Sequence, residues 1–194
     1  RGIESLVPAA LERSVVIPNM IREDLFLPPE APRKADPFVF LWAGRLEHVK
    51  GLDLLLEAAK SLGKTSDRGF TIRLAGKGSL RETLEQKAVA LGIKDRVSFL
   101  GRLSRSEMLA EMQGANCFVL PSRYEAFGVV LIEAMATGLP VIATRSGGPD
   151  SIVDSESGLL ITPGSTDELT LAMQELMSNS DLYSATEIRK QTLL

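Results

Sequence analysis

Residues 117–144 read CFVLPSRYEAFGVVLIEAMATGLPVIAT and predict a strand, a helix and a second strand in that order. The strands are expected at Cys117–Pro121 and Pro140–Thr144, because both are short apolar runs rather than amphipathic helical patterns. The helix is expected at Gly128–Thr137, and the glycine and proline that follow it end it. This order of elements is typical of a parallel sheet covered by helices.

The same alternation of strands and helices extends over most of the chain. Gly51–Leu62 carries apolar residues at helical spacing, and Ser104 precedes Glu107 as in a capping box. The sequence therefore predicts an α/β fold, a Rossmann-like parallel sheet of about six strands with helices on both faces. Further strands are expected at Phe38–Ala43, Phe70–Ala75, Arg96–Leu100 and Gly158–Thr162, and further helices at Gly51–Leu62, Leu80–Leu91, Ser104–Met112 and Asp167–Met177.

The chain is expected to hold one domain between two less regular ends. Its 194 residues, 44% of them hydrophobic, can bury one α/β core, which we place at residues 38–177. Residues 1–37 are rich in proline and are expected to be an interdomain connector and the start of the domain. Residues 178–194 are polar and weakly helical, and we expect this tail to be truncated. The absence of an initiator methionine also predicts a fragment of a longer protein.

Composition and charge exclude several classes of protein. The net charge of -3 argues against the broad basic surface that binds nucleic acid. No apolar run approaches the roughly 18 residues of a transmembrane helix, and the first residues lack a signal-peptide pattern. Cys117 is the single cysteine and lies in an apolar run, so it is expected to be a core residue. A cytoplasmic location is compatible with this cysteine content.

The loop after the first expected strand carries two cations, Arg45 and Lys50, behind Gly44. Together they could hold a diphosphate, because ligands of open α/β sheets bind at the carboxyl ends of the strands. A solvated basic loop is the alternative, and for the pair taken alone it is the stronger one. His48 has no Cys, His or carboxylate set around it, so we expect a surface histidine and no metal site.

The loop Gly76–Arg81 follows the second strand and raises the possibility of a dinucleotide-binding glycine motif. The motif fits poorly, because Arg81 occupies the third glycine position and its side chain would obstruct close contact between helix and strand. An oxidoreductase that uses a nicotinamide or flavin is therefore disfavoured. The glycines let the backbone approach part of a nucleotide, or they form a tight turn.

Two glutamates flank the start of the helix expected at Gly128–Thr137. Glu133 is the only charge on this helix, which is so apolar that we expect it to be buried on all sides. A buried carboxylate needs donors, and a ribose diol or a structural salt bridge would serve equally well. Glu125 is expected in the preceding loop, beside free backbone N–H groups that form an anion site. The alternative for Glu125 is a carboxylate that stabilises the helix dipole.

In their order and spacing these motifs resemble the retaining glycosyltransferases of the glycosyltransferase-B fold, the group that includes sucrose, sucrose-phosphate and bacterial mannosyl transferases. The likeness rests on Glu125 and Glu133 with seven residues between them, and it extends over nearly the whole chain. It implies that Glu133 binds the donor ribose, that Glu125 lies beside the transferred sugar, and that Arg45 and Lys50 hold the diphosphate. Glu125, Arg45 and Lys50 would form the catalytic group. The donor-binding residues implied are Gly44, Arg45, Lys50, Gly76, Gly101, Arg102, Leu103, Glu125, Ala126, Phe127, Gly128, Val129, Val130 and Glu133.

The resemblance also implies the reaction. Residues 38–177 would be the domain that binds a UDP-, GDP- or ADP-sugar, and the full-length protein would transfer a hexosyl group to an acceptor with retention of configuration. The acceptor would be bound mainly by a missing N-terminal domain, so the isolated chain should be inactive. No cofactor or metal is expected, and the location is cytoplasmic or peripheral to the membrane through the missing domain. The alternative function is a non-catalytic module that binds a nucleotide or a sugar.

Overall fold

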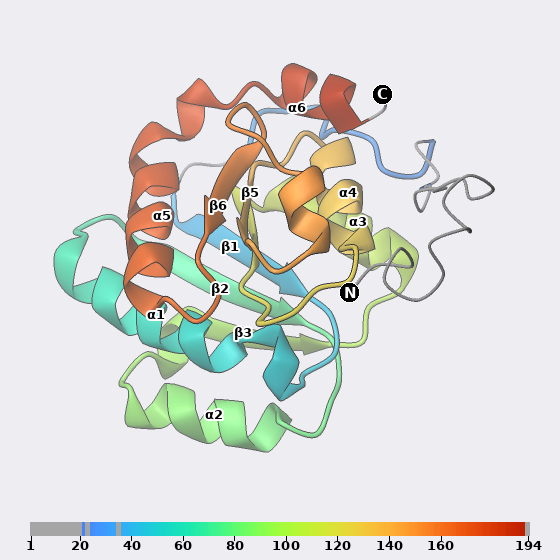
Figure 1. Cartoon of the computed structure of the whole chain (residues 1–194). Helices are drawn as coiled ribbons and strands as arrows, with labels where there is room; N and C mark the ends of the chain where they lie inside the picture. The colour runs from blue at the N-terminus through green and yellow to red at the C-terminus, as the bar shows by residue number, and fades with distance from the viewer. Residues whose placement is uncertain (1–20, 22–23, 34–35, 193–194) are drawn as a thin grey trace, which may run out of the picture.

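The computed structural model describes residues 21, 24–33 and 36–192, and its centre is a parallel sheet. The strands are β1 (Phe38–Ala43), β2 (Phe70–Ala75), β3 (Val97–Gly101), β4 (Cys117–Leu120), β5 (Val141–Thr144) and β6 (Gly158–Ile161). They form one six-stranded sheet in the order β3-β2-β1-β4-β5-β6, in which all neighbours are parallel (Figure 1). The predicted α/β fold with a Rossmann-like sheet is confirmed.

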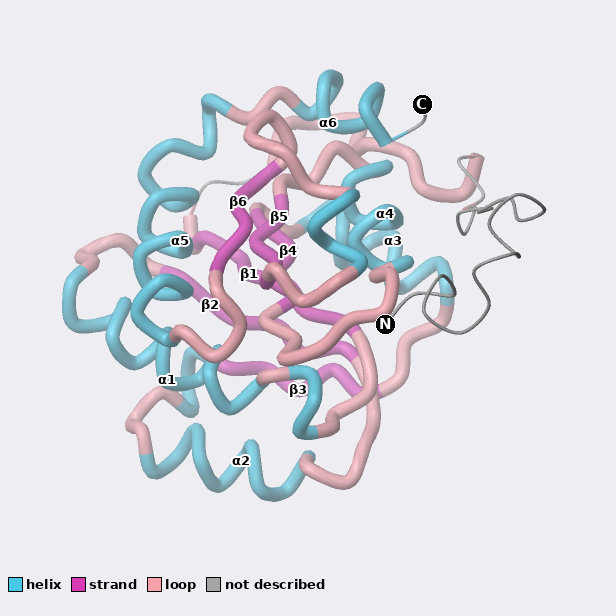
Figure 2. The backbone as a smooth tube through the Cα atoms, viewed as in Figure 1, coloured by secondary structure: helices cyan, strands magenta, loops and turns pink. Residues whose placement is uncertain are grey.

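Helices cover both faces of this sheet. They are α1 (Leu52–Thr65), α2 (Arg81–Ala90), α3 (Arg105–Gly114), α4 (Val129–Ala136), α5 (Thr166–Asn179) and α6 (Ala185–Thr192). Short 3-10 turns occur at η3 (His48–Lys50), η4 (Lys94–Arg96), η5 (Gly148–Ser151) and η6 (Ser180–Leu182). α1 packs against α2 and α5 on one face, whereas α3 and α4 lie on the other and α6 packs against α4 (Figures 1 and 2).

The elements predicted from the sequence are present, with ends that differ by a few residues. β1 and β2 have the predicted bounds, and α1 extends three residues beyond Leu62, the predicted end. The predicted capping box of α3 is confirmed: Ser104 Oγ accepts from the Glu107 N–H at 3.3 Å, and a Glu107 carboxylate oxygen accepts from the Ser104 N–H at 2.7 Å. Local start and stop signals therefore act as the sequence predicts.

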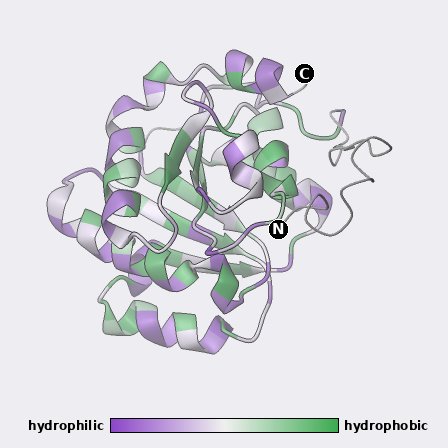
Figure 3. Cartoon of the chain, viewed as in Figure 1, coloured by the Kyte–Doolittle hydropathy of each residue, from purple (hydrophilic) through white to green (hydrophobic). Residues whose placement is uncertain are grey.

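The core is built on the apolar side chains of the sheet. Trp42, Phe38, Phe40 and Phe118 are fully buried between the sheet and its helices. Figure 3 shows hydrophobic strands at the centre and helices whose outward faces are more hydrophilic. Cys117 is buried on β4, as predicted, and desolvation raises the pKa of its thiol.

α4 differs from its prediction in burial. Leu131, Ala134, Met135 and Ala136 are buried, but Val129 is 37% exposed and Glu133 is partly exposed. The expectation that this helix is buried on all sides is therefore wrong. Its composition is apolar apart from Glu133, but the described part of the chain covers only one face and the C-terminal end.

Segments near both ends of the described chain pack on the C-terminal end of α4. An Arg33 guanidinium nitrogen donates to the Thr137 carbonyl at 2.7 Å, and Arg189 of α6 donates to the carbonyls of Ala136 and Phe26. These cations satisfy carbonyls that the helix leaves without partners. Burial lowers the pKa of Arg33 to about 10. The folded core thus includes residues on either side of the range 38–177.

The loops after β1 and β2 pack closely because of Gly76. Its φ of +146° is a conformation that side chains rarely allow, and a Cβ there would lie 1.8 Å from the Gly44 carbonyl oxygen. The Gly44 N–H donates to the Ala75 carbonyl at 3.0 Å, and the Leu46 N–H donates to that of Lys77 at 3.0 Å. This contact sets the position of the Gly44 backbone.

We expect Gly76→Ala to lower the free energy of unfolding by about 2 kcal/mol or more, because the new methyl group meets backbone that cannot move aside. Gly114→Ala is the matched control, since Gly114 ends α3 with open space around it. The control should change stability by less than about 1 kcal/mol, in the stabilising direction. Urea unfolding followed by circular dichroism measures the stability of both variants. Equal stability would contradict the close approach of Gly76 to the Gly44 carbonyl.

Candidate functional site

A cleft of about 280 Å³ lies at the carboxyl ends of β1 and β4. These strands are neighbours at the point where the strand order turns from β1 to β4, the position at which open α/β sheets bind ligands. The lining contains the last residue of each strand, a loop from each, and the start of α4. The lining residues are Ala43, Gly44, Arg45, Lys50, Leu120, Glu125, Gly128, Val129 and Val130.

Lys50 and Glu125 meet inside this cleft. Lys50 ends η3 and Glu125 lies in the loop before α4, and their Nζ and Oε2 atoms are 2.7 Å apart. Both side chains are largely shielded, with exposed fractions of 18% and 14%. Ser122 Oγ is 3.5 Å from the same carboxylate oxygen. The predicted phosphate-binding lysine and the predicted sugar-side glutamate are therefore one short-range ion pair.

Arg45 and Lys50 differ in setting, although the sequence presents them as a pair. The side chain of Arg45 is 74% exposed, and its guanidinium lies 2.8 Å from Glu47 at the rim of the cleft. Arg45 thus fits the solvated basic loop that was the alternative interpretation, while Lys50 does not. Of the two cations, Lys50 is the one held in place by the fold.

The turn into α4 presents backbone donors. The N–H groups from Ala126 to Val130 donate no hydrogen bond to any described residue, whereas the Leu131 N–H donates to the Gly128 carbonyl at 2.8 Å. Gly128, Val129 and Val130 line the cleft beside Lys50. Unpartnered amides at a helix N-terminus beside a lysine form a site that favours an anion. Glu125 lies in the loop before this turn, as predicted.

Glu133 lies one helical turn further along α4. Within the described chain it forms no hydrogen bond or ion pair, so the structural salt bridge considered from the sequence is absent there. Desolvation raises the pKa of Glu133, and the positive charge of Arg105 opposes part of this rise. A partly buried carboxylate without a partner is typical of a group that receives hydrogen bonds from a ligand.

Several residues predicted to bind the donor lie outside the cleft lining. Gly76 lies against Gly44 of the lining, where a Cβ would be 1.8 Å from the Gly44 carbonyl oxygen, and its N–H donates to the Gly101 carbonyl at 2.7 Å. Gly101 ends β3, and Arg102 and Leu103 follow it toward α3. Ala126 and Phe127 belong to the turn before Gly128. These residues, and Glu133 on α4, are therefore not part of the cleft lining.

Two cleft residues were missed from the sequence. Ala43 and Leu120 are the last residues of β1 and β4 and form its apolar floor. They carry no chemical signal, but the rule that ligands bind at strand carboxyl ends could have identified them. His48 is exposed in η3, as expected for a surface histidine. Across residues 24–33 and 36–192, no group of three or more His, Cys, Asp or Glu is arranged to hold a metal ion.

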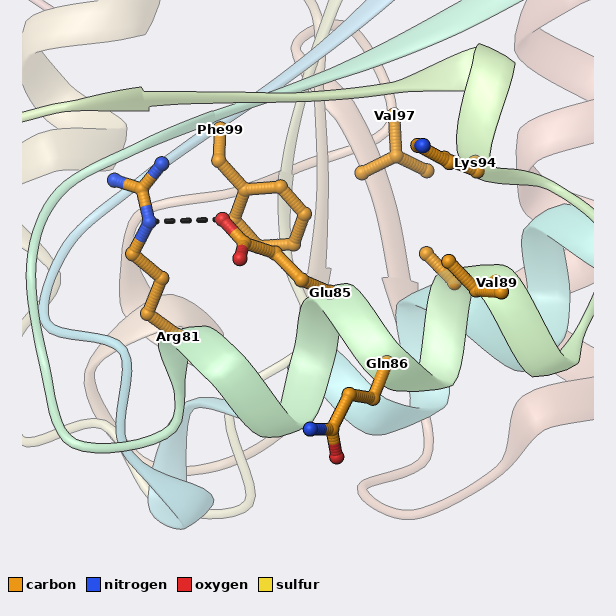
Figure 4. Close-up of a pocket in the computed structure, with 8 residues that line it drawn as sticks. Arg81, Glu85, Gln86, Val89, Lys94, Val97 and Phe99 are labelled. Atoms are coloured by element: carbon orange, nitrogen blue, oxygen red, sulfur yellow. Dashed lines mark hydrogen bonds and ion pairs between the residues drawn. The ribbon is translucent and has the colours of Figure 1, made fainter.

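A second hollow, of about 470 Å³, lies between α2 and the edge strand β3 (Figure 4). Arg81 and Glu85 form an exposed ion pair of 2.8 Å across its rim, and Phe99 and Val97 line its strand side. Although larger, this hollow contains none of the predicted donor-binding residues and no free helix amide of α4. The cleft at β1 and β4 is therefore the stronger candidate site.

The family model for glycosyl transferases group 1 matches residues 26–192. The chain belongs to this family. An uncharacterized glycosyltransferase of Methanocaldococcus jannaschii is 33% identical over 171 residues, which are 88% of this chain and 45% of that relative. The D-inositol 3-phosphate glycosyltransferase of Mycobacteroides abscessus is 37% identical over 150 residues, or 74% and 33% of the two chains. The match to this chain thus covers less than half the length of each of these relatives.

Solved structures show the same fold. Sucrose-phosphate synthase of Thermosynechococcus elongatus matches with a TM-score of 0.81 and 29% identity, over 96% of this chain and 51% of that one. The C-terminal domain of a group 1 glycosyl transferase of Francisella tularensis matches with a TM-score of 0.80 and 26% identity, and the match covers 90% of this chain and 97% of that one. Anabaena HepE in complex with UDP and glucose matches with a TM-score of 0.71 and 28% identity, and the match covers 81% of this chain and 43% of that one. The fold is that of a glycosyltransferase-B C-terminal domain. No helix of the described chain has the length and apolarity needed to span a membrane.

We expect Glu133→Gln to stabilise this group 1 domain at pH 7, by less than about 1 kcal/mol because water still reaches and screens the charge. The folded-state pKa of Glu133 is raised, so its charged form destabilises the fold at pH values above that pKa. The gain should shrink as the pH falls and vanish below the ordinary pKa of a glutamate. Thermal unfolding of both proteins between pH 3 and pH 8 measures this difference. A less stable variant at pH 7 would instead indicate a structural salt bridge.

Proposed function

We propose that this chain is the donor-binding half of a glycosyltransferase that transfers a hexosyl group from a nucleoside diphosphate sugar with retention of configuration. The observation that carries this proposal is the meeting of Lys50 and Glu125 in a cleft lined by free amides of α4. A cation and amide donors suit a diphosphate, while a carboxylate suits sugar hydroxyl groups. The three features lie within one cleft of about 280 Å³.

The diphosphate is proposed to lie against Lys50 and the amides of Gly128, Val129 and Val130. Entry of the diphosphate would place its charge beside the Lys50 ammonium, which Glu125 otherwise neutralises alone. Arg45 at the rim would approach the outer phosphate oxygens, since its exposed side chain is free to leave Glu47. The UDP and glucose in the similar HepE structure support a sugar nucleotide as the ligand class.

The rest of the donor is proposed to extend along α4 toward the end of β3. Glu133 would accept hydrogen bonds from the ribose diol, because it is partly desolvated and has no partner in the described chain. Gly101, Arg102 and Leu103 would contact the base through their backbone. Glu125 would lie at the opposite end of the donor, beside the sugar.

Catalysis would depend on electrostatic stabilisation of the leaving group. Breaking the bond between sugar and phosphate develops negative charge on the diphosphate, and Lys50, Arg45 and the α4 amides are placed to offset it. Because these groups supply the positive charge, the proposed mechanism requires no divalent cation. Glu125 would stabilise positive character at the anomeric carbon. The acceptor is proposed to bind mainly to an N-terminal domain, in keeping with relatives of which the match to this chain covers 45% and 33%.

We expect the chain to bind at least one of UDP, GDP and ADP weakly, with a Kd near the millimolar range of half a binding site. Glu133→Ala should weaken that binding by more than about 1 kcal/mol without unfolding the domain, because the ribose loses its acceptor. NMR titration measures the affinity, and Glu156→Ala, on an exposed turn, serves as the control. Equal affinity of Glu133→Ala and wild type would contradict the ribose assignment. Binding of nicotinamide dinucleotides instead would favour an oxidoreductase.

We expect the full-length protein to transfer sugar with retained anomeric configuration and to depend on Glu125, whereas this chain alone transfers negligibly. Donor and acceptor must be held together in a water-poor cleft, and this chain provides one side of it. Glu125→Gln in the full-length enzyme should reduce kcat far more than it weakens nucleotide binding, because Glu125 is assigned to the sugar.

Initial rates, nucleotide affinity and NMR of the product's anomeric centre check these expectations. An inverted product would contradict retention, and full activity of Glu125→Gln would remove its catalytic role. Nucleotide binding without any transfer by the full-length protein would favour a non-catalytic binding module.

A further inference from the structure

Arg123 connects the two loops of the cleft through four hydrogen bonds. Its guanidinium donates to both carboxylate oxygens of Asp53, at 2.8 Å and 2.7 Å, and to the His48 carbonyl at 2.8 Å. Its backbone N–H donates to the Val49 carbonyl at 2.8 Å. Arg123 therefore binds the turn η3 at two carbonyls and the first turn of α1 at Asp53.

The two loops joined by Arg123 each carry one partner of the ion pair in the cleft. Lys50 follows Val49 in η3, and Glu125 lies two residues after Arg123. Between them the backbones are in close contact at Gly51, where a Cβ would lie 1.9 Å from the Pro121 carbonyl oxygen and φ is +68°. Only glycine allows this approach, so the loops are held together at their backbones as well as through side chains.

We infer that Arg123, anchored by Asp53, is a positioning residue that holds Lys50 where it contacts the diphosphate and where it pairs with Glu125. This inference rests on the proposed function of the cleft. The guanidinium of Arg123 is engaged by Asp53 and the His48 carbonyl, so it acts through the η3 backbone and not by contact with the ligand. Lysine has a long flexible side chain, and fixing its backbone removes part of the freedom that ligand binding would otherwise have to restrict.

The strength of the Arg123–Asp53 pair supports this role. It is bidentate and partly shielded, with exposed fractions of 28% and 35%. The hydrogen bonds from Arg123 lower the pKa of Asp53, and those bonds raise the pKa of Arg123 in turn. Both groups thus stay charged in the fold, and the fork geometry fixes their relative orientation.

The experiment compares affinities for a nucleoside diphosphate and its monophosphate in this chain. The probe is whichever of UDP, GDP and ADP binds the wild type best, with UMP, GMP or AMP to match. Fractional unfolding lowers the apparent affinity for both nucleotides by the same factor, whereas misplacement of Lys50 lowers the affinity for the diphosphate selectively. The ratio of the two affinities therefore separates positioning from a general loss of structure.

The variants are Arg123→Met and Asp53→Asn, the second being a smaller change that retains the fold if the first does not. Lys50→Met reports the phosphate site, and Arg73→Met is the control, since the Arg73–Glu111 pair of 2.9 Å touches neither loop. We expect Arg123→Met to lower the preference for the diphosphate about tenfold, an effect of about 1.4 kcal/mol. Asp53→Asn should lower it in the same direction, and Arg73→Met should leave it unchanged.

The double variant Lys50→Met/Arg123→Met should show no further loss of preference beyond Lys50→Met, because Arg123 acts through Lys50. Additive losses would overturn the inference by indicating a direct contact of Arg123 with phosphate. Suppose that Lys50→Met lowers the preference for the diphosphate while Arg123→Met and Asp53→Asn leave it unchanged. That result would overturn the inference about Arg123 but not the proposed function of the cleft. An unchanged preference in Lys50→Met would contradict the proposed function and the inference together.

Discussion

The site depends on the adjacency of β1 and β4, which pair at Phe40 with Cys117 and at Leu41 with Phe118. From β1 the chain winds in one direction to β2 and β3, and from β4 it winds in the other to β5 and β6. The loops that leave the two strands therefore diverge and leave a crevice between them. Lys50 and Glu125 meet there only because the sheet places these strands side by side.

A second set of contacts keeps this crevice in one shape. Behind it, Gly76 lets the β2 loop support Gly44, and at its side Gly51 lies against the Pro121 carbonyl. Each contact is between backbone atoms, which cannot adjust as side chains do. The cleft is thus shaped by glycines at these backbone contacts, and the side chain of Arg123 adds hydrogen bonds that fix the η3 loop within the frame.

The sequence predicts the fold and the surroundings of the site better than the contacts within it. The presence and order of the strands, the cap of α3 and the loop position of Glu125 follow from local patterns, and the structure confirms them, although several strand ends differ by a residue. The Lys50–Glu125 and Arg123–Asp53 pairs join distant segments, so they depend on strand order and could not be predicted from spacing. The burial of α4 was misjudged, because an apolar composition does not show which face the chain covers. Glu133 lies on this helix without a hydrogen-bond or ion-pair partner in the described chain, and desolvation raises its pKa.

The most direct test of this account is a crystal structure of the chain with a UDP-, GDP- or ADP-sugar. The account predicts diphosphate oxygens within hydrogen-bond distance of Lys50 Nζ and of the amides at Gly128–Val130, with the sugar beside Glu125. Ligand density in the hollow between α2 and β3, or a diphosphate that contacts neither Lys50 nor the start of α4, would contradict it.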